Sequence, residues 1–147
     1  MIALIQRVSE AKVVVNNKNI GEIQQGLLVF VGIEKNDNEE QVPRLVDKVL
    51  SYRVFADEED KMNLSVQDIK GGLLLVPQFT LAADTQKGCR PSFSSAAAPE
   101  VGEKLFNEFI QQAKNKYQYI ETGQFGADMK VFLLNDGPVT FWLQVNK

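Results

Sequence analysis

Two segments of the sequence carry residues whose types and spacing could support chemistry. The first is PQFTLAADTQKGCRPSFSS (77–95), where an apolar run meets Gln78 and Thr80 and then a long loop with four further serine or threonine hydroxyls. The second is NDGPVT (135–140), close to the end of the 147-residue sequence. Long irregular loops in compact domains are often functional, so the first segment is a candidate site.

The absence of histidine restricts this chemistry most strongly. Neither a Ser-His-Asp triad nor a Cys-His dyad can be built, and Thr80 has no neighbour in sequence that would activate its hydroxyl as a nucleophile. A catalytic zinc ion normally takes three protein ligands, chiefly His and Cys, and the only cysteine is Cys89. We therefore predict no metal and no cofactor, and a mechanism that uses backbone dipoles, hydroxyls, charged side chains or the substrate's own groups.

Local rules give both segments a plainer interpretation. In the first, residues 78–81 alternate as in a strand, with Phe79 and Leu81 pointing inward. In the second, Asp136-Gly137 between apolar runs is a hairpin signal, and Pro138 then begins an edge strand. A Gly-Pro bond is also one of the few peptide bonds that adopts the cis form at low cost. Periodicity alone thus favours a strand and a turn over two sites.

Composition indicates one domain spanning residues 1–147. The chain is 44% hydrophobic, which suffices for a core without disulfides, and its N-terminus lacks the apolar run of a signal peptide or membrane span. We expect a cytoplasmic protein without membrane contact. A net charge of −3 and a pI near 5.0 argue against wrapping DNA or a long stretch of RNA, although a short contact through Lys87 and Arg90 remains open.

Strand patterns dominate the first third of the sequence and return near its end. Asn16-Asn17 marks a turn between two short runs, and residues 26–33 are continuously apolar, as in a strand buried on both faces. The remaining strands are expected in the segments YRVFAD, GGLLLVPQFTLA, DMKVFLLN and PVTFWLQV. Trp142 and Phe141 would lie on opposite faces of the last strand, in a core or a subunit interface.

Two segments have helical periodicity instead. Residues 39–51 place Pro43 in the first turn, where proline is tolerated, and their apolar stripe is Val42, Leu45, Val46, Val49 and Leu50. A second helix begins at Pro99 and ends near Lys116, with the stripe Val101, Leu105, Phe106, Phe109, Ile110 and Ala113. The sequence therefore predicts a mixed α/β domain in which two helices pack on one sheet.

The two candidate segments together also resemble the paired signatures of a known family. QFTLAADT followed by NDGPVTFWLQV is similar to the motifs of D-aminoacyl-tRNA deacylases, also called D-tyrosyl-tRNA deacylases. The resemblance extends over essentially the whole chain, through MIALIQRV, GEIQQGLLVFVGIEK, DKMNLSV, GCRPSFS and TGQFGADM. It implies one deacylase-like domain, with a largely antiparallel, partly barrel-like sheet covered by two main helices.

The resemblance implies an activity and its partners. The expected reaction is hydrolysis of the ester bond of D-aminoacyl-tRNA, which releases the D-amino acid and tRNA as a step of translation quality control. Glycyl groups mischarged on tRNA-Ala are expected substrates too, because glycine has no side chain to be rejected. The family acts as a homodimer with its active sites at the subunit interface, where each site grips the CCA end of tRNA.

The resemblance also assigns roles residue by residue. Gln78, Phe79 and Thr80 are expected in catalysis, and substrate binding and chiral selection are expected of Leu81, Asn135, Gly137, Pro138, Val139 and Thr140. In this family the Gly-Pro peptide is cis, and its carbonyls leave no room for an L side chain. Arg7 and Met129 are expected to support that loop, and Lys87 and Arg90 to contact tRNA. Pro77 departs from the family's usual serine, which removes a hydroxyl and an N–H donor.

Other classes of function stay open on the residues alone. A non-catalytic module of the same fold that binds RNA ends would leave aminoacyl-tRNA intact, whereas a general esterase would cleave free aminoacyl esters without tRNA. A structural dimer with hairpin turns at both motifs would do neither. Turnover on D-aminoacyl-tRNA separates these alternatives from a deacylase.

Overall fold

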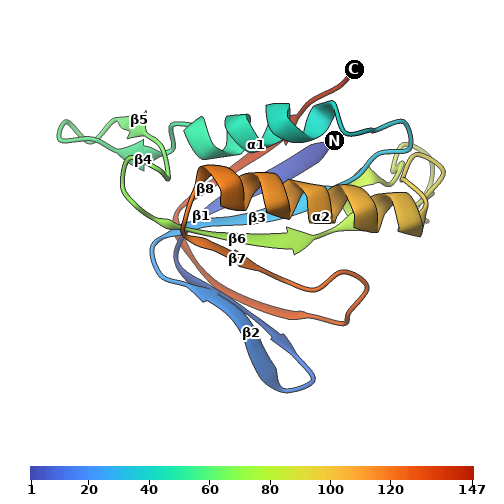
Figure 1. Ribbon diagram of the computed structural model, residues 1–147, viewed down its shortest axis with the longest axis horizontal. Coiled ribbons are helices and arrows are strands. Elements are labelled where there is room, and N and C mark those ends of the chain that lie inside the picture. The colour runs from blue at the N-terminus through green and yellow to red at the C-terminus, as the bar shows by residue number, and fades with distance from the viewer.

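A strongly curved sheet organises the chain in the computed structural model, which describes residues 1–147 (Figure 1). Its six strands are β1 (Ile2–Val15), β2 (Lys18–Ile23), β3 (Gly26–Gly32), β6 (Gly72–Pro77), β7 (Ile120–Thr122) and β8 (Lys130–Gln144). A separate two-stranded ribbon is formed by β4 (Phe55–Ala56) and β5 (Met62–Leu64). The expected strand YRVFAD is therefore limited to two of its residues.

Strand β1 holds the sheet together because it pairs with three others. One edge pairs with β8 from Ile2 to Val14, and the other edge is divided between β3 and then β2, all antiparallel. Strand β1 runs to the predicted turn at Asn16-Asn17, where both φ angles are positive, as in a type I′ hairpin, and β2 follows it. Because one strand serves three partners, the sheet curls into a nearly closed barrel.

The most deeply buried strands run parallel. Strand β3 pairs with β6 and β6 pairs with β7, which explains the continuous apolar run in β3. The predicted fold class is confirmed: the sheet is mixed and barrel-like, its β1 pairings are antiparallel, and two helices cover it. No helix of the chain is both long and apolar enough to cross a membrane.

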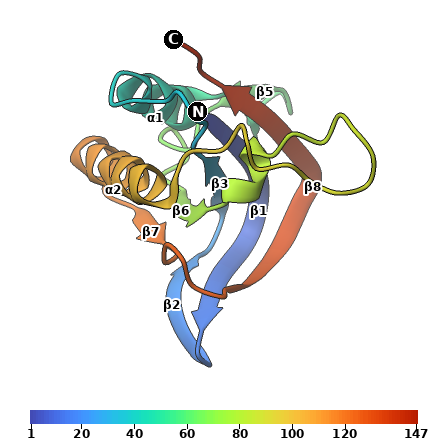
Figure 2. The same ribbon diagram turned by 90° about the vertical axis from the view of Figure 1, so that its right-hand side faces the viewer.

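Helices α1 (Gln41–Ser51) and α2 (Pro99–Lys116) lie side by side on one face of the sheet (Figures 1 and 2). The predicted stripe of α1 is buried in full, with Pro43 in the first turn as expected. In α2 the prediction for Val101 is wrong, because this side chain is exposed and Gly102 is buried in its place. A Cβ on Gly102 would lie 3.4 Å from the ring of Phe125, so this helix face packs closely against that ring.

Both candidate segments differ from the plain interpretation of their local sequence. Strand β6 ends at Pro77, and a 3₁₀ turn, η1 (Phe79–Ala82), replaces the expected strand. NDGPVT is not a hairpin turn either, since β8 continues through it as one strand of 15 residues. Trp142 and Phe141 of this strand are exposed in the single chain and do not belong to its core.

Candidate active site

The first motif lies where β6 turns into η1. The N–H of Gln78 donates to the carbonyl of Val31 at 2.8 Å, which extends the β3–β6 pairing by one residue before the chain turns. The Gln78 side-chain amide then donates to Thr80 Oγ1 at 2.6 Å. Alternation fails here because the tight turn directs the Phe79 ring outward, where it is 59% exposed. The motif is therefore a polar turn with an exposed ring, at the end of a buried strand.

Two backbone donors at the start of this turn are left free by its own hydrogen bonds. Phe79 and Thr80 open η1, so their N–H groups precede its first hydrogen bond, which Leu81 donates to Gln78, and neither takes part in the hydrogen bonds of the chain's loops and turns. The carbonyls of Gln78 and Thr80 do accept bonds, from Leu81 and Ala83. Two adjacent free N–H groups on a fixed turn can stabilise a developing negative charge on a substrate oxygen.

A pocket of about 480 Å³ opens beside these donors. Gln78 and Phe79 form its rim, and most of its lining is apolar, including Val31, Ile33, Ala97, Phe106, Phe125 and Met129. Its size and its few polar groups suit a small-molecule ligand or one end of a larger ligand. Neither motif predicted the contribution of Phe125, or the ring of Phe93 that stacks on Phe79 at 5.3 Å between centroids. Phe125 and Phe93 occur in the segments TGQFGADM and GCRPSFS, which also resemble the family. That resemblance was the only signal in the sequence that could have identified these two residues.

Met129 lies in the wall of this pocket. Its sulfur accepts a hydrogen bond from the N–H of Gln124 at 3.4 Å. A Cβ on Gly123 would lie 2.8 Å from the same sulfur, so Gly123 leaves the space that Met129 fills. Within one chain Met129 thus supports the pocket wall, next to Gln78 and Phe79.

The second motif forms a bulge in β8. Gln6 pairs with Thr140 and Val8 pairs with Asn135, so residues 136–139 stand opposite Arg7 alone. The Gly137-Pro138 peptide is cis, as the family resemblance implies. Thr140 Oγ1 accepts a bond from the Gln6 amide at 3.3 Å, and Asn135 is exposed. A bulge on an edge strand redirects the backbone out of the sheet.

Arg7 fixes this bulge from the neighbouring strand. Its Nε donates to the carbonyl of Asp136 at 3.0 Å, and its Nη1 donates to the carbonyl of Val54 at 2.7 Å. The Asp136 carboxylate lies 3.6 Å from Nε, and the Arg7 side chain is only 15% exposed. Arg7 therefore forms a bridge between the bulge and the residue that precedes β4.

Gly137 occupies a position that a side chain would strain. Its φ of +130° is one that L residues rarely adopt. A Cβ there would lie 2.9 Å from Val139 Cγ2 and 3.1 Å from Arg7 Nη2. Val139 itself packs against the main core, which limits its freedom to move away. Glycine is therefore required at this position by both backbone conformation and space.

The two motifs do not meet within one chain. None of residues 135–140 lines the pocket beside Gln78 and Phe79. Lys87 and Arg90 lie at the exposed tip of a loop that a pair of hydrogen bonds between Asp84 and Ser92 closes. Cys89 at the same tip is free and exposed. One chain thus carries a pocket with donors at one place and a braced Gly-Pro bulge at another.

Apolar side chains are exposed along β8 on both sides of the bulge. The exposed fractions are 52% for Phe132, 56% for Leu134 and 50% for Trp142. Lys12 of β1 covers the Phe132 ring in part, with its Nζ 5.0 Å from the centroid. Contiguous exposed apolar side chains on a soluble protein usually mark an interaction surface. We refer to Phe132, Leu134 and Trp142 as the β8 apolar patch.

Known proteins are similar to this chain over nearly its whole length. The family model described as D-Tyr-tRNA(Tyr) deacylase matches residues 4–144. Proteins named D-aminoacyl-tRNA deacylase from Photorhabdus laumondii and Haemophilus influenzae are 60% and 61% identical over 145 residues, covering 99% of this chain and 100% of theirs.

Two solved structures are similar over nearly the full length. One, named c-Myc DNA Unwinding Element Binding Protein, has a TM-score of 0.95 and 39% identity, with 100% of both chains covered. The other, described as a probable eukaryotic D-amino acid tRNA deacylase, has a TM-score of 0.86 at 17% identity, with 98% of both chains covered. The second likeness concerns the fold alone.

Proposed function

The chain belongs to the D-Tyr-tRNA(Tyr) deacylase family, and from this premise we propose that it hydrolyses the ester bond of D-aminoacyl-tRNA. The products are the free D-amino acid and tRNA. The observation that carries this proposal is the pair of free N–H groups of Phe79 and Thr80 in a turn whose residues Gln78 and Phe79 line an apolar pocket. Such donors favour an acyl-transfer reaction, in which a carbonyl oxygen gains negative charge.

The reaction requires no nucleophilic side chain. Water adds to the ester carbonyl, and the oxygen of the tetrahedral intermediate accepts hydrogen bonds from the N–H groups of Phe79 and Thr80. The bond to the ribose oxygen then breaks, and the proton that water releases ends on that oxygen. The neighbouring ribose hydroxyl assists the attacking water. This route needs neither a metal ion nor histidine.

Thr80 positions the substrate in this mechanism and does not attack it. Its hydroxyl accepts a hydrogen bond from the Gln78 amide, and the QFTL segment contains no general base to activate it. The free N–H of Thr80 belongs to the backbone, so its contribution survives removal of the hydroxyl. Gln78 in turn orients the hydroxyl toward the pocket rim.

Chiral selection is assigned to the Gly-Pro bulge of a second subunit. The bulge lies outside the pocket of its own chain, and the β8 apolar patch offers a surface through which two chains can associate. In a homodimer each bulge would enter the pocket of the partner. The carbonyls of Gly137 and Pro138 would then receive the substrate's α-amino group and exclude an L side chain. Glycyl-tRNA passes such a filter, because it has no side chain to clash.

The acidic surface fits a protein that binds only the end of tRNA. Few phosphates need to be neutralised when the CCA end alone is held, so a net charge of −3 is compatible with binding. Lys87 and Arg90 at the exposed loop tip are assigned to these contacts. Phe93 on the same loop stacks on Phe79, which connects the loop to the first motif.

The test is release of labelled amino acid from matched D- and L-tyrosyl-tRNA at limiting enzyme, with a metal chelator present. We expect rapid cleavage of the D substrate only. Thr80→Ala should retain most single-turnover activity, as should the control Thr85→Ala in the exposed loop. Loss of activity in the chelator would reject the metal-free route. A trapped acyl-enzyme that disappears in Thr80→Ala would assign Thr80 as nucleophile instead.

A non-catalytic binding module is the second candidate. In its favour, the solved structure that is 39% identical to this chain is named as a protein that binds a DNA element. The net charge of −3 and the pI near 5.0 weigh against this role for the present chain. A module of this kind would leave both tyrosyl-tRNA substrates intact in the same experiment.

A further inference from the structure

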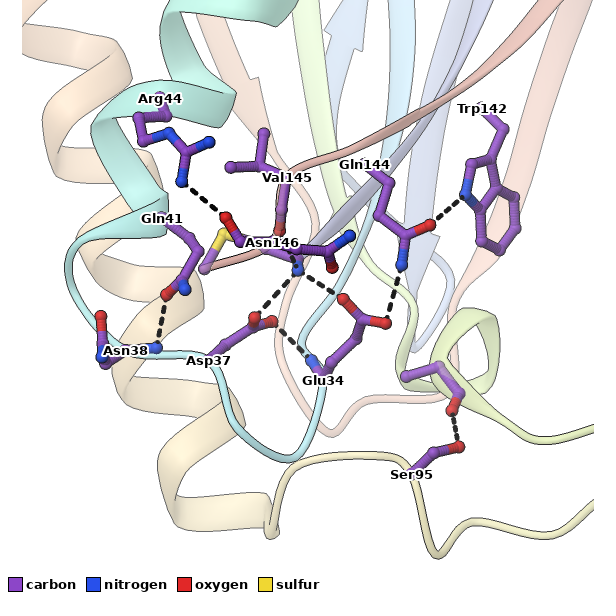
Figure 3. A network of polar contacts seen from close by, with 12 residues as sticks. Glu34, Asp37, Asn38, Gln41, Arg44, Ser95, Trp142, Gln144, Val145 and Asn146 are labelled. Carbon is purple, nitrogen blue, oxygen red and sulfur yellow. Dashed lines mark hydrogen bonds and ion pairs between the residues drawn. The ribbon is translucent and has the colours of Figure 1, made fainter.

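The α-ammonium group of Met1 lies in a buried polar site at the end of the sheet. It donates to Glu34 Oε2 at 2.6 Å, to Asp37 Oδ1 at 2.9 Å and to the carbonyl of Val145 at 2.9 Å. Met1 is fully buried and the Asp37 side chain is 6% exposed. Three N–H donors thus meet three acceptors, and one positive charge faces two carboxylates (Figure 3).

The two carboxylates are held by a wider set of hydrogen bonds. Asp37 Oδ2 accepts from the N–H of Glu34 at 2.7 Å, so the loop after β3 closes on itself. Glu34 Oε1 accepts from the Gln144 amide at 2.9 Å, and Gln144 Oε1 accepts from Trp142 Nε1 at 3.3 Å (Figure 3). The ammonium site therefore connects the loop after β3 with β8, the strand that carries the Gly-Pro bulge.

The same loop forms part of the pocket wall. The carbonyl of Ile33 accepts from the N–H of Ala97 at 3.1 Å, and both residues line the pocket. The N–H of Lys35 donates to the carbonyl of Ser95 at 3.0 Å. Ser95 Oγ in turn donates to the carbonyl of Ala82, the last residue of η1, at 2.6 Å. A displacement of the loop after β3 would reach both the pocket wall and the catalytic turn.

We propose that this cluster is a site specific for a free α-ammonium group, and that acylation of the Met1 nitrogen disables the enzyme. A formyl or acetyl group converts the ammonium into a neutral amide with a single N–H donor and a carbonyl oxygen. Glu34 and Asp37 would then face that oxygen without a countercharge, and the Asp37 side chain, which is only 6% exposed, has little access to water. This proposal describes a regulation of the deacylase activity proposed above, and it rests on that activity.

The consequence for the pocket follows from the connections of the loop. The buried carboxylate of Asp37 must move away from Glu34 or become solvated once the countercharge is lost, and either change displaces the loop after β3 from β1. Ile33 and Ser95 are bound to this segment and move with it. Because catalytic geometry tolerates little displacement, we expect a large loss of activity from a small shift of the wall.

The experiment compares two forms of the full chain that differ only at the Met1 nitrogen. One is produced in cells whose peptide deformylase is inhibited, so that it retains N-formyl-Met1, and the other is fully deformylated; mass spectrometry verifies both. We expect the formylated chain to unfold at a temperature lower by about 6 to 15 °C. Its kcat/KM on D-tyrosyl-tRNA should fall by at least about tenfold.

Hydrogen exchange provides a readout independent of activity. The amide of Glu34 is protected by Asp37, and the amide of Val145 donates to the carbonyl of Met1 at 3.0 Å. Both amides should exchange faster in the formylated chain, whereas the amides of α1 beyond its first turn should not change. Equal exchange and equal unfolding temperatures in the two forms would overturn the proposal.

A double substitution tests whether charge is the cause. In Glu34→Gln/Asp37→Asn the carboxylates become amides, which can donate to a formyl oxygen, so formylation should lower the unfolding temperature much less than in the native sequence. Glu58→Gln, at an exposed position without partners, is the control and should retain the full effect of formylation. An undiminished effect in the double variant would reject the ammonium site in favour of simple steric exclusion.

The outcomes separate this proposal from the proposed function. If the deformylated chain does not cleave D-tyrosyl-tRNA, the proposed function fails, and with it the predicted loss of activity. If it cleaves the substrate and the formylated chain does so equally well, the function stands and the ammonium proposal is overturned. A loss of stability, protection and activity together supports both.

Discussion

The Nε atom of Arg7 donates a hydrogen bond to the carbonyl of Asp136 at 3.0 Å, and this contact joins β1 to the bulge in β8. The same guanidinium donates from Nη1 to Val54 at 2.7 Å. One planar group therefore fixes two backbone segments that are distant in sequence. This geometry needs the several N–H donors that the planar guanidinium of arginine holds in fixed directions. The single ammonium group of lysine cannot reproduce it.

Arg7→Lys should consequently lose stability and chiral discrimination together. With the side chain 15% exposed, we expect a decrease of about 2 kcal/mol in the free energy of unfolding, measured in urea. We also expect slower cleavage of D-tyrosyl-tRNA and a smaller ratio of D to L rates, because the bulge is less well fixed. Arg53→Lys, at an exposed site, is the matched control. An unchanged ratio of D to L rates in Arg7→Lys would show that Arg7 does not contribute to chiral selection.

Gly137→Ala should be harmful because of both conformation and space. The φ of +130° and the approach of a Cβ to 2.9 Å from Val139 Cγ2 predict a loss of about 1–3 kcal/mol in unfolding free energy and loss of most D-specific activity. Gly88→Ala is the control, because Gly88 also has a positive φ, +64°, but no atom lies within 4 Å of its Cβ position. Similar losses in both variants would show that crowding at Gly137 is unimportant.

Phe132→Glu should dissociate the proposed homodimer. A charge placed in the β8 apolar patch opposes association, so sedimentation should show a monomer with little deacylase activity. Met62→Glu introduces the same charge at a side chain of similar exposure, 48% against 52%, outside the patch. It should remain dimeric and active. A dimeric, active Phe132→Glu protein would place the interface elsewhere.

Mixing two inactive variants tests whether the sites are shared between subunits. Gly137→Ala removes the bulge, and a Phe79→Pro chain lacks one of the two free N–H donors. After random reassociation, one site in each mixed dimer has both intact parts, so activity should recover to about a quarter of the native level. Mixtures that stay inactive would argue that each chain forms its own site.

Tyr117 predicts how stability depends on alkaline pH. Burial raises the pKa of its phenol above the ordinary 10.0, with a smaller contribution from Tyr119. Since the folded chain holds this proton more tightly than the unfolded chain, the stabilisation is complete below the ordinary value and is lost as pH rises through the folded-state pKa. The urea midpoint should therefore fall as the pH rises above about 10, and less so in Tyr117→Phe. Tyr52→Phe should show the native dependence.

The sequence predicted the elements that depend on local pattern. The apolar period of α1, the proline at the start of α2 and the Asn16-Asn17 turn all express preferences over a few neighbouring residues. Period alone predicts that Val101 points inward. The structure turns Gly102 inward instead because the ring of Phe125, distant in sequence, occupies that side of α2.

Local sequence patterns predicted less of the candidate site. Asp136-Gly137 has the local signature of a hairpin, but β8 pairs with β1 on both sides of it, and Arg7 holds the intervening residues as a bulge. The 3₁₀ turn at Phe79 likewise depends on where β3 and β6 end. Pattern alone would have stopped at a mixed α/β domain. The motifs were identifiable because QFTL and NDGPVT occur together in a family-like chain.

The bulge at residues 136–139 also changes how β8 can behave as a sheet edge. Strand β8 pairs with β1 on one side, so its other side presents unpaired backbone groups over 15 residues, enough to recruit a further strand. Pro138 has no N–H to offer, and the bulge breaks the spacing of the remaining groups. The segment assigned to chiral selection therefore also protects the protein against open-ended strand addition and aggregation.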